Sequence, residues 1–184
     1  YNDDPGEAMD LRIPSLLRIK PGALNKTGTY LRSLSFKTAA LFYSPGMREL
    51  TSAALTNSLA GAQINVACDK IRDTNSIEDI FDDMKKLPAS CDVLLAIGGG
   101  KVIDYVKYLS LISAIPMVSI PTSVSNDGFS SPLSSLMVNS ARNNKILADA
   151  LGHIVLAPYV QLIEVPTGPV DRSMGDVHPL GNPH

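Results

Sequence analysis

The stretch "LLAIGGGKVIDYVKYLS" (residues 94–110) decides the fold, because three consecutive glycines join an apolar run to a helical pattern. Residues 92–97 show no polar alternation within their apolar core, which is typical of a central strand covered on both faces. After the glycines, apolar residues recur at helical spacing at Val102, Tyr105, Val106 and Leu109. A strand that turns into a helix through glycines presents free backbone N–H groups, which suit a phosphate or pyrophosphate.

Two common phosphate-binding motifs do not fit these glycines. The spacing is not G-x-G-x-x-G, because Ile103 occupies the place of the third glycine. A P-loop is excluded because Val102, and not Ser or Thr, follows Lys101. A tight strand-to-helix turn that binds no ligand therefore stays open as the alternative.

Outward from this stretch, short apolar runs alternate with helical patterns. We expect strands at residues 15–20, 37–43, 62–67, 92–97 and 116–120. Helices are expected at residues 23–34 and 47–60, after Ser76, and after the glycines. Ser44 before Pro45 predicts a helix N-cap, and Ser76 with Asp79 resembles a capping box. Strands separated by helices need crossover connections, so we predict an α/β fold: a Rossmann-like, mainly parallel sheet with flanking helices.

Composition narrows the function classes. The 184 residues are 45% hydrophobic and carry a formal net charge of −2, which gives no reason to expect nucleic acid as a partner. The longest apolar region, residues 105–120, is interrupted by Lys107 and Pro116 and is too short for a membrane span. The N-terminus does not read as a signal peptide. We expect a soluble, cytoplasmic protein whose two cysteines are buried free thiols.

A second informative stretch is "SIPTSVSNDGFSSPLSS" (residues 119–135). It follows the next expected strand, so it opens on the same edge of the sheet as the glycines. Its hydroxyl and amide groups can orient a ribose, a nicotinamide or a polyol. Taken alone, the stretch favours the alternative of a flexible serine-rich loop or an Asx turn at residues 126–128.

Together, "GGGKVIDYVK" and "IPTSVSNDGFSSPLSSL" resemble the sn-glycerol-1-phosphate dehydrogenase family, within the dehydroquinate synthase-like superfamily that includes the iron-type alcohol and glycerol dehydrogenases. The segment "IPSLLRIKPGALNKTGTYL" is similar to the opening strand and first helix of that family. The resemblance covers roughly residues 10–156 and implies an NAD(P)-binding α/β domain, which we place at residues 10–158.

The resemblance also implies roles for individual residues. A cofactor-binding role is implied for Gly98, Gly99, Gly100, Lys101, Val102, Thr122, Ser123, Val124, Ser125 and Ser131. Asp127 matches a substrate-binding carboxylate that accepts hydrogen bonds from polyol hydroxyls. Asp104 and Lys107 match the helix that follows the glycines, with a solvated i,i+3 ion pair as the equally good alternative.

The reaction implied by the resemblance is hydride transfer from NAD(P)H to dihydroxyacetone phosphate, which gives sn-glycerol 1-phosphate. A zinc ion, held by one Asp and two His of a C-terminal helical domain, would polarise the carbonyl. The choice between NAD and NADP stays open, because the strand expected at residues 37–43 leads into "SPG" without a carboxylate. Oligomeric state stays open too, a homo-oligomer included.

Residues 159–184 depart from that family. Prolines become frequent and helical periodicity disappears, so we expect a proline-rich irregular tail in place of the helical domain. Residues 162–184, with "GDVHPLGNPH", resemble the metal-site segment of zinc and manganese ABC-transporter solute-binding proteins. The tail offers Asp176, His178 and His184 as metal ligands, one fewer than zinc usually takes.

Three hypotheses follow. The first is the nucleotide-binding part of a glycerol-1-phosphate dehydrogenase, in a truncated or chimeric chain that is inactive alone. The second is a metal-binding module whose functional part is the tail. The third is a dinucleotide-binding domain without chemistry.

Overall fold

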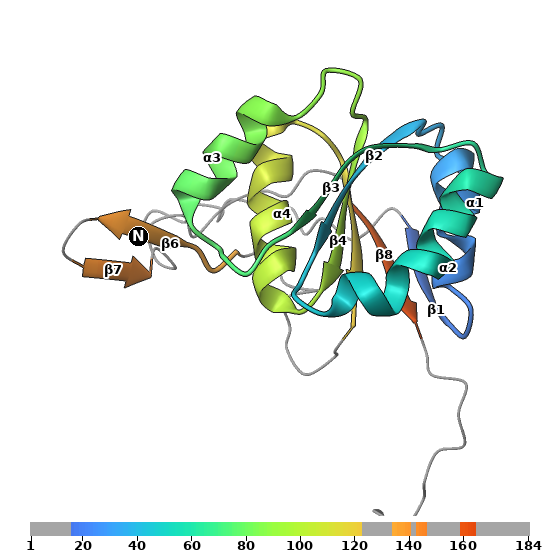
Figure 1. The fold of residues 1–184 in the computed structure, drawn as a ribbon, viewed down its shortest axis with the longest axis horizontal. Helices are drawn as coiled ribbons and strands as arrows, with labels where there is room; N and C mark the ends of the chain where they lie inside the picture. Colours follow the sequence, from blue (N-terminus) through green and yellow to red (C-terminus); the bar gives the residue numbers. More distant parts are fainter. Residues whose placement is uncertain (1–15, 123–133, 141–142, 147–158, 165–184) are drawn as a thin grey trace, which may run out of the picture.

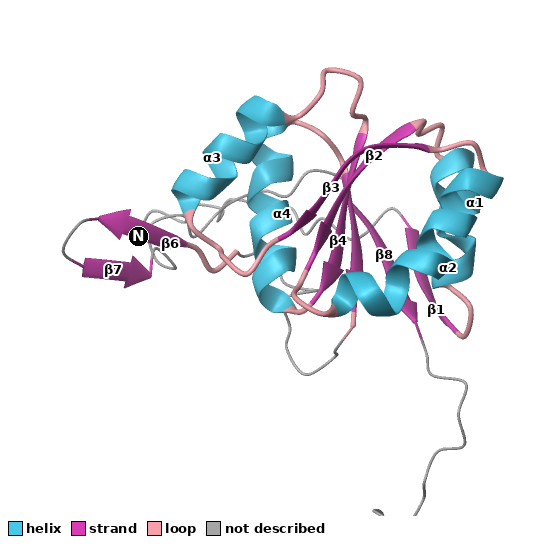
Figure 2. Ribbon diagram, viewed as in Figure 1, coloured by secondary structure: helices cyan, strands magenta, loops and turns pink. Residues whose placement is uncertain are grey.

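The computed structural model describes residues 16–122, 134–140, 143–146 and 159–164 (Figure 1). Six parallel strands form one sheet in the order β1-β8-β5-β4-β2-β3. In that order they are Leu16–Lys20, Tyr159–Glu164, Met117–Pro121, Val93–Gly98, Thr38–Tyr43 and Asn65–Ile71. The helices are η1 (Leu24–Lys26), α1 (Thr27–Ser33), α2 (Met47–Gly61), α3 (Ile77–Lys86) and α4 (Gly100–Ser113). Strands β6 (Met137–Ser140) and β7 (Asn143–Ile146) form a separate antiparallel hairpin (Figure 2).

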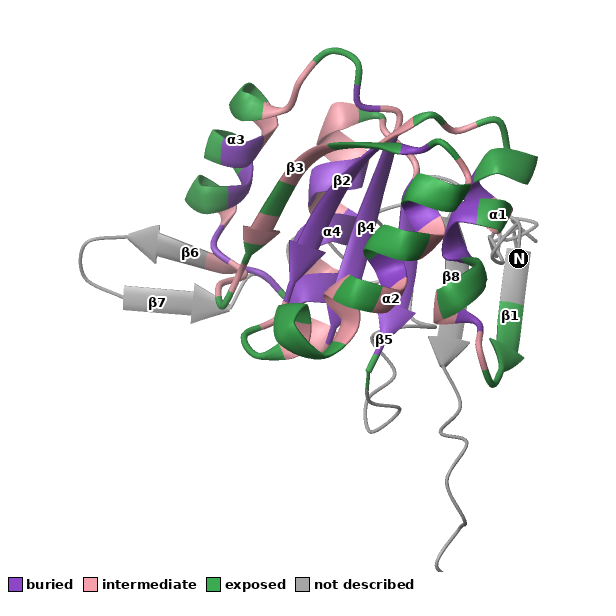
Figure 3. Cartoon of the chain, turned by 45° about the vertical axis from the view of Figure 1, so that its right-hand side comes forward, coloured by how far each residue is buried: buried purple, intermediate pink, exposed green. Residues whose placement is uncertain are grey.

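Helices cover the sheet on both faces, which confirms the predicted Rossmann-like α/β fold (Figure 1). Successive residues of a strand point to opposite faces, so β2 and β4 contribute to two separate cores. Phe42 and Leu94 pack on the side of α3 and α4, whereas Leu41 and Leu95 pack on the side of α1 and α2. Every residue of β4 is buried, as its unbroken apolar run predicts (Figure 3).

The connections diverge between β2 and β4. Strand β2 leads through α2, on one face, to β3, and β4 leads through α4, on the other face, to β5. The two strands are neighbours, but their helices leave in opposite directions. In open α/β sheets, ligands bind in the crevice at such a topological switch point, beyond the carboxyl ends of the strands. The glycines at residues 98–100 end β4 and begin α4, and therefore lie at this point.

Of the two predicted helix caps, Ser44 is wrong, whereas Ser76 is the N-cap residue of α3 but does not form the expected capping hydrogen bond. Helix α2 is preceded by Gly46, in the left-handed conformation at φ 77°, and the Ser44 side chain is used elsewhere. At α3, within the described residues, Ser76 makes no capping hydrogen bond, and its hydroxyl donates to Glu78 at 2.6 Å instead. The Ser44 hydroxyl bonds to the distant Gly99, and the Ser76 hydroxyl bonds to a carboxylate in the first turn of its own helix, so other partners compete for both hydroxyls.

Two boundaries also shift. The strand expected at residues 62–67 is β3, which begins at Asn65, because the helix before it continues through Gly61. Residues 159–164, expected in the irregular tail, form β8 between β1 and β5. The sheet therefore extends beyond the boundary expected at residue 158. Helical periodicity is absent at residues 159–164 because they form a strand, in which side chains alternate between the two faces with a period of two residues.

Two further expectations concern thiols and membranes. Cys91 is buried, Cys68 is partly buried, and both are free thiols. Burial is the main cause that raises the pKa of both, which keeps them protonated at neutral pH. Across the described segments, no helix combines the length and apolar character that a membrane crossing needs.

Candidate functional site

The turn between β4 and α4 is held against the end of β2. Ser44, which follows β2, accepts a hydrogen bond at its Oγ from Gly99 N, 3.2 Å away. Ser44 N in turn donates to the carbonyl oxygen of Ile97 at 2.9 Å. These two contacts fix the glycine turn at the switch point between β2 and β4.

Gly98 and Gly99 differ in what surrounds them. Gly98 has φ +146°, and a Cβ atom there would collide with the side chain of Ser44. Only glycine fits this position without strain. A Cβ on Gly99, by contrast, would meet no described atom within 4 Å. Contact with Ser44 thus requires glycine at position 98. Among the described residues nothing requires it at position 99, which leaves space that a ligand can occupy.

The N-terminus of α4 presents backbone donors toward that space. No described side chain caps the helix, whose N-cap residue is Gly99. The first N–H groups of a helix have no partner within it, and the helix dipole favours an anion there. That residues 98–102 hold a pyrophosphate stays a prediction, and the side chains of these residues are not placed alike.

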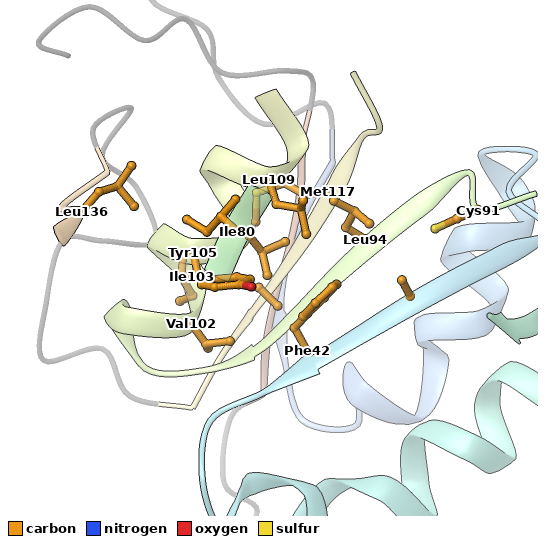
Figure 4. Close-up of a cluster of buried hydrophobic side chains, with 13 residues drawn as sticks. Phe42, Ile80, Cys91, Leu94, Val102, Ile103, Tyr105, Leu109, Met117 and Leu136 are labelled. Carbon is orange, nitrogen blue, oxygen red and sulfur yellow. The ribbon is translucent and has the colours of Figure 1, made fainter. Parts of the chain in front are cut away.

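Lys101 and Val102 illustrate the difference. The Val102 side chain is fully buried in the core with Ile103 and Tyr105, so only its backbone can reach a ligand (Figure 4). The Lys101 side chain is 53% exposed, and its Nζ lies 2.8 Å from Asp73 Oδ1. An exposed ammonium in the first turn adds positive charge beside the free N–H groups.

Asp73 is a residue that the sequence analysis missed. The strand at residues 37–43, after which an acidic residue would favour NAD, is followed by Ser44. Asp73 follows β3, the neighbouring strand, and its carboxylate reaches the glycine helix through Lys101. The motif "KIRDTN" carries no local signal for this contact, because Lys101 lies 28 residues further along the chain.

The serine-rich stretch begins beside the glycine turn. Thr122 N donates to the carbonyl oxygen of Gly98 at 3.1 Å, and Pro121 pairs with Gly98 in the sheet register. The structure therefore brings Thr122 together with the glycines, as predicted. Eight other predicted site residues lie outside the described residues: Ser123, Val124, Ser125, Asp127, Ser131, Asp176, His178 and His184.

Asp104 and Lys107 form an ion pair, but it is not solvated. Lys107 is 2% exposed, Asp104 is 14% exposed, and Lys107 Nζ lies 3.3 Å from Asp104 Oδ1. The alternative of a solvated surface pair is therefore wrong. A lysine is rarely buried unless it is paired, and Asp104 supplies the opposite charge for buried Lys107.

A cluster of charged side chains around the buried carboxylate of Asp83 links α3 to the first turns of α4. Asp83 of α3 accepts hydrogen bonds from Lys70 at 2.8 Å, from Arg72 at 2.6 and 2.7 Å, and from Tyr105 of α4 at 2.6 Å. Burial opposes ionisation of Asp83, but the bonds from Arg72, Lys70 and Tyr105 outweigh it and lower its pKa to about 2. We call Asp83, Lys70, Arg72 and Tyr105 the Asp83 cluster.

A cavity of about 270 Å³ opens beside this cluster at the carboxyl end of β3. Its lining includes Arg72, Asp73, Thr74, Asp79 and Lys86 but none of residues 98–102. The four carboxylates of the lining are already bonded: Asp73 to Lys101, Asp79 to Thr74, Asp82 to Lys85 and Asp83 to Arg72. Among the described residues, no group of three or more His, Cys, Asp or Glu could hold a metal ion.

The fold and the glycine turn define the class: an α/β domain whose helix α4 begins, without a described side-chain cap, at the switch point of a parallel sheet. A family model described as "Iron-containing alcohol dehydrogenase" matches residues 18–155. The chain therefore belongs to the iron-containing alcohol dehydrogenase family.

The chain is also similar to curated proteins that share one enzyme name. The chain is 27% identical over 128 residues to glycerol-1-phosphate dehydrogenase [NAD(P)+] of Thermofilum pendens, which covers 70% of this chain and 36% of the relative. It is 26% identical over 168 residues to the enzyme of that name from Pyrobaculum aerophilum, covering 90% and 45%. The chain thus spans less than half the length of these relatives.

Solved structures agree on the fold. An alcohol dehydrogenase from Oenococcus oeni superimposes with a TM-score of 0.69 at 14% identity, over 85% of this chain and 46% of that one. Glycerol dehydrogenase from Schizosaccharomyces pombe gives a TM-score of 0.65 at 19% identity, over 85% and 39%. These matches do not support the second resemblance, of residues 162–184 to solute-binding proteins.

Proposed function

We propose that this chain is the cofactor-binding part of an NAD(P)-dependent glycerol-1-phosphate dehydrogenase. The observation that carries the proposal is the open space over Gly99, which faces the uncapped N-terminus of α4 at the switch point. A pyrophosphate there would accept hydrogen bonds from the backbone N–H groups of residues 100–102. The likeness to two enzymes named glycerol-1-phosphate dehydrogenase [NAD(P)+] supports this cofactor class.

In this proposal, the site residues that the structure describes have separate roles. Gly99 leaves room for the phosphate oxygens, and Ser44 holds the turn in place. Lys101 contributes positive charge, and the exposed Thr122 lies where the serine-rich stretch begins. Bound NAD(P)H would supply the hydride, while the protein supplies position and electrostatics.

The substrate pair is proposed as dihydroxyacetone phosphate and sn-glycerol 1-phosphate. This assignment rests on the resemblance and on the names of the relatives, with Asp127 as the predicted partner of the polyol hydroxyls. Because the chain spans less than half of those relatives, we expect it to bind cofactor without reducing dihydroxyacetone phosphate by itself. Steady oxidation of NADPH by the purified chain in the presence of dihydroxyacetone phosphate would contradict this expectation.

The described residues do not fit the zinc ion of the family, since they contain no suitable ligand group. No step of the proposal therefore depends on a metal. Asp176, His178 and His184 stay predicted ligands from sequence, as does the alternative of a metal-binding module. Zinc binding measured on the intact chain, and on a His178→Ala/His184→Ala variant, decides that alternative: equal affinities would end it.

The proposal is tested by titrating the purified chain with NADH and NADPH and following the fluorescence of the reduced nicotinamide. We expect saturable binding in the original chain and loss of at least tenfold in affinity in Gly99→Val, whose side chain fills the phosphate space. Gly61→Val, at the end of α2 and with nothing within 4 Å of a Cβ, serves as the matched control. Absence of binding by the folded original chain would refute the proposal.

A further inference from the structure

The last residue of the serine-rich stretch, Ser135, is bound by two side chains from different elements. Asp104 Oδ2, in α4, accepts a hydrogen bond from Ser135 N at 3.2 Å. Asn75, in the loop between β3 and α3, donates from Nδ2 to the carbonyl oxygen of Ser135 at 2.8 Å. Both backbone polar groups of Ser135 are therefore engaged by these two side chains.

The neighbours of Ser135 reinforce this attachment. The backbone carbonyl of Asn75 accepts a hydrogen bond from Met137 N at 3.0 Å. Leu136 is fully buried and belongs to the same core cluster as Ile80 and Ile103 (Figure 4). The segment at residues 134–137 is thus fixed by both hydrogen bonds and apolar packing, and we call it the return anchor.

The start of the serine-rich stretch is attached to the same structural unit. Thr122 N donates to Gly98 O at the end of β4, and Asp104 lies in the helix that follows β4. Asp104 is four residues beyond Gly100, which corresponds to about 6 Å along a helix axis. Thr122 and Ser135 are therefore both attached to the β4–α4 unit, Thr122 at the glycine turn and Ser135 at the first turns of α4.

The carboxylate of Asp104 is oriented by a second contact. Its Oδ1 lies 3.3 Å from the Nζ of Lys107, which is 2% exposed. A hydrogen bond to a charged group is stronger and better defined than one between neutral groups. With Lys107 on one oxygen and Ser135 on the other, the carboxylate joins a buried cation to the return anchor.

We propose that Asn75 and Asp104 are positioning residues for cofactor binding. They hold the return anchor on the β4–α4 unit, and this sets where the serine-rich stretch ends relative to the glycine turn. Neither residue needs to touch the cofactor. The inference rests on the proposed function and adds residues to it that no resemblance assigns to cofactor binding.

The test is a titration with NADPH of the 184-residue chain and of four variants: Asn75→Ala, Asp104→Ala, the double variant and Ile64→Val. We expect each single anchor variant to raise the Kd about fivefold, as befits the loss of one hydrogen bond. The double variant should lose less than the product of the two, because both side chains act through Ser135. Asn75→Ala decides the question, because Asp104→Ala also removes a charge partner from buried Lys107.

The control variant separates positioning from general stability. Ile64 is 5% exposed and packs in the core on the opposite face of the sheet, away from the return anchor. We expect Ile64→Val to lower the melting temperature without changing the Kd for NADPH. An equal rise of the Kd in Ile64→Val, or an unchanged Kd in Asn75→Ala, would overturn the inference while the proposed function stands. No binding by the original chain would overturn both.

Discussion

Gly98 and Gly99 are neighbours in the sequence, yet the structure gives them opposite requirements. Gly98→Ala places a Cβ against Ser44 in a backbone conformation with φ +146°, whereas Gly99→Ala places it in open space. We expect Gly98→Ala to reduce the free energy of unfolding by about 1–3 kcal/mol, as strained backbone positions do. Gly99→Ala should leave stability unchanged and weaken NADPH binding. Urea unfolding and the fluorescence titration measure the two effects, and the reverse pattern would contradict this assignment.

Lys101 and Asp73 give a second residue-scale prediction. Asp73 is 70% exposed and holds the ammonium of Lys101 at 2.8 Å, so it competes with a bound phosphate for that charge. We expect Lys101→Ala to weaken NADPH binding by about threefold to tenfold, and Asp73→Ala to strengthen it slightly. Both effects should shrink at high salt, because exposed charges are screened. Equal weakening by both variants would instead indicate that Asp73 itself binds the cofactor.

At the scale of elements, the Asp83 cluster joins β3, α3 and α4. Asp83 is nearly inaccessible to solvent, and its oxygens bond to Lys70, Arg72 and Tyr105. Removing one partner of a buried ion pair leaves an uncompensated charge, so we expect Asp83→Ala to cost about 3–5 kcal/mol of stability. Asp82→Ala, an exposed neighbour on the same helix, should cost less than about 1 kcal/mol. Chemical unfolding of the two variants makes the comparison.

The same cluster predicts a pH dependence. The folded-state pKa of Asp83, about 2, lies below the ordinary value of 3.8, so the ionised carboxylate stabilises the folded state. This contribution, about 2 kcal/mol, is complete above about pH 4 and is lost as the pH falls through 2. Unfolding curves between pH 2 and 5 should show the loss. An unchanged pH profile in Asp83→Asn would show that another group is responsible.

Sequence patterns predicted the elements with strong periodicity better than their ends. The unbroken apolar run of β4 and the stripe of α4 were recognisable, because burial on both faces and helical spacing leave clear signals. Ser44 could not be assigned correctly, because its hydroxyl bonds to Gly99, 55 residues away. The contact between Asn75 and Ser135 could not be predicted either, since only the folded chain brings these two residues together. Long-range contacts of this kind have no local pattern.

At the scale of the whole molecule, cofactor binding should stabilise the chain. A ligand that binds only the folded state adds about 2.7 kcal/mol at a concentration one hundred times its Kd. We expect NADPH above its Kd to raise the melting temperature of the original chain with the logarithm of its concentration, and to have little effect on Gly99→Val. A similar rise in both would indicate binding away from the glycine turn.

The turn after β4 is proposed to hold the phosphates of a dinucleotide through backbone N–H groups. Hydrogen exchange of the backbone amides, measured with and without NADPH, therefore reports on the proposed contacts themselves. We expect slower exchange at residues 100–102, with smaller changes in α2 on the other face. Unchanged exchange at these residues under saturating NADPH, or protection confined to the cavity beside β3, would contradict it.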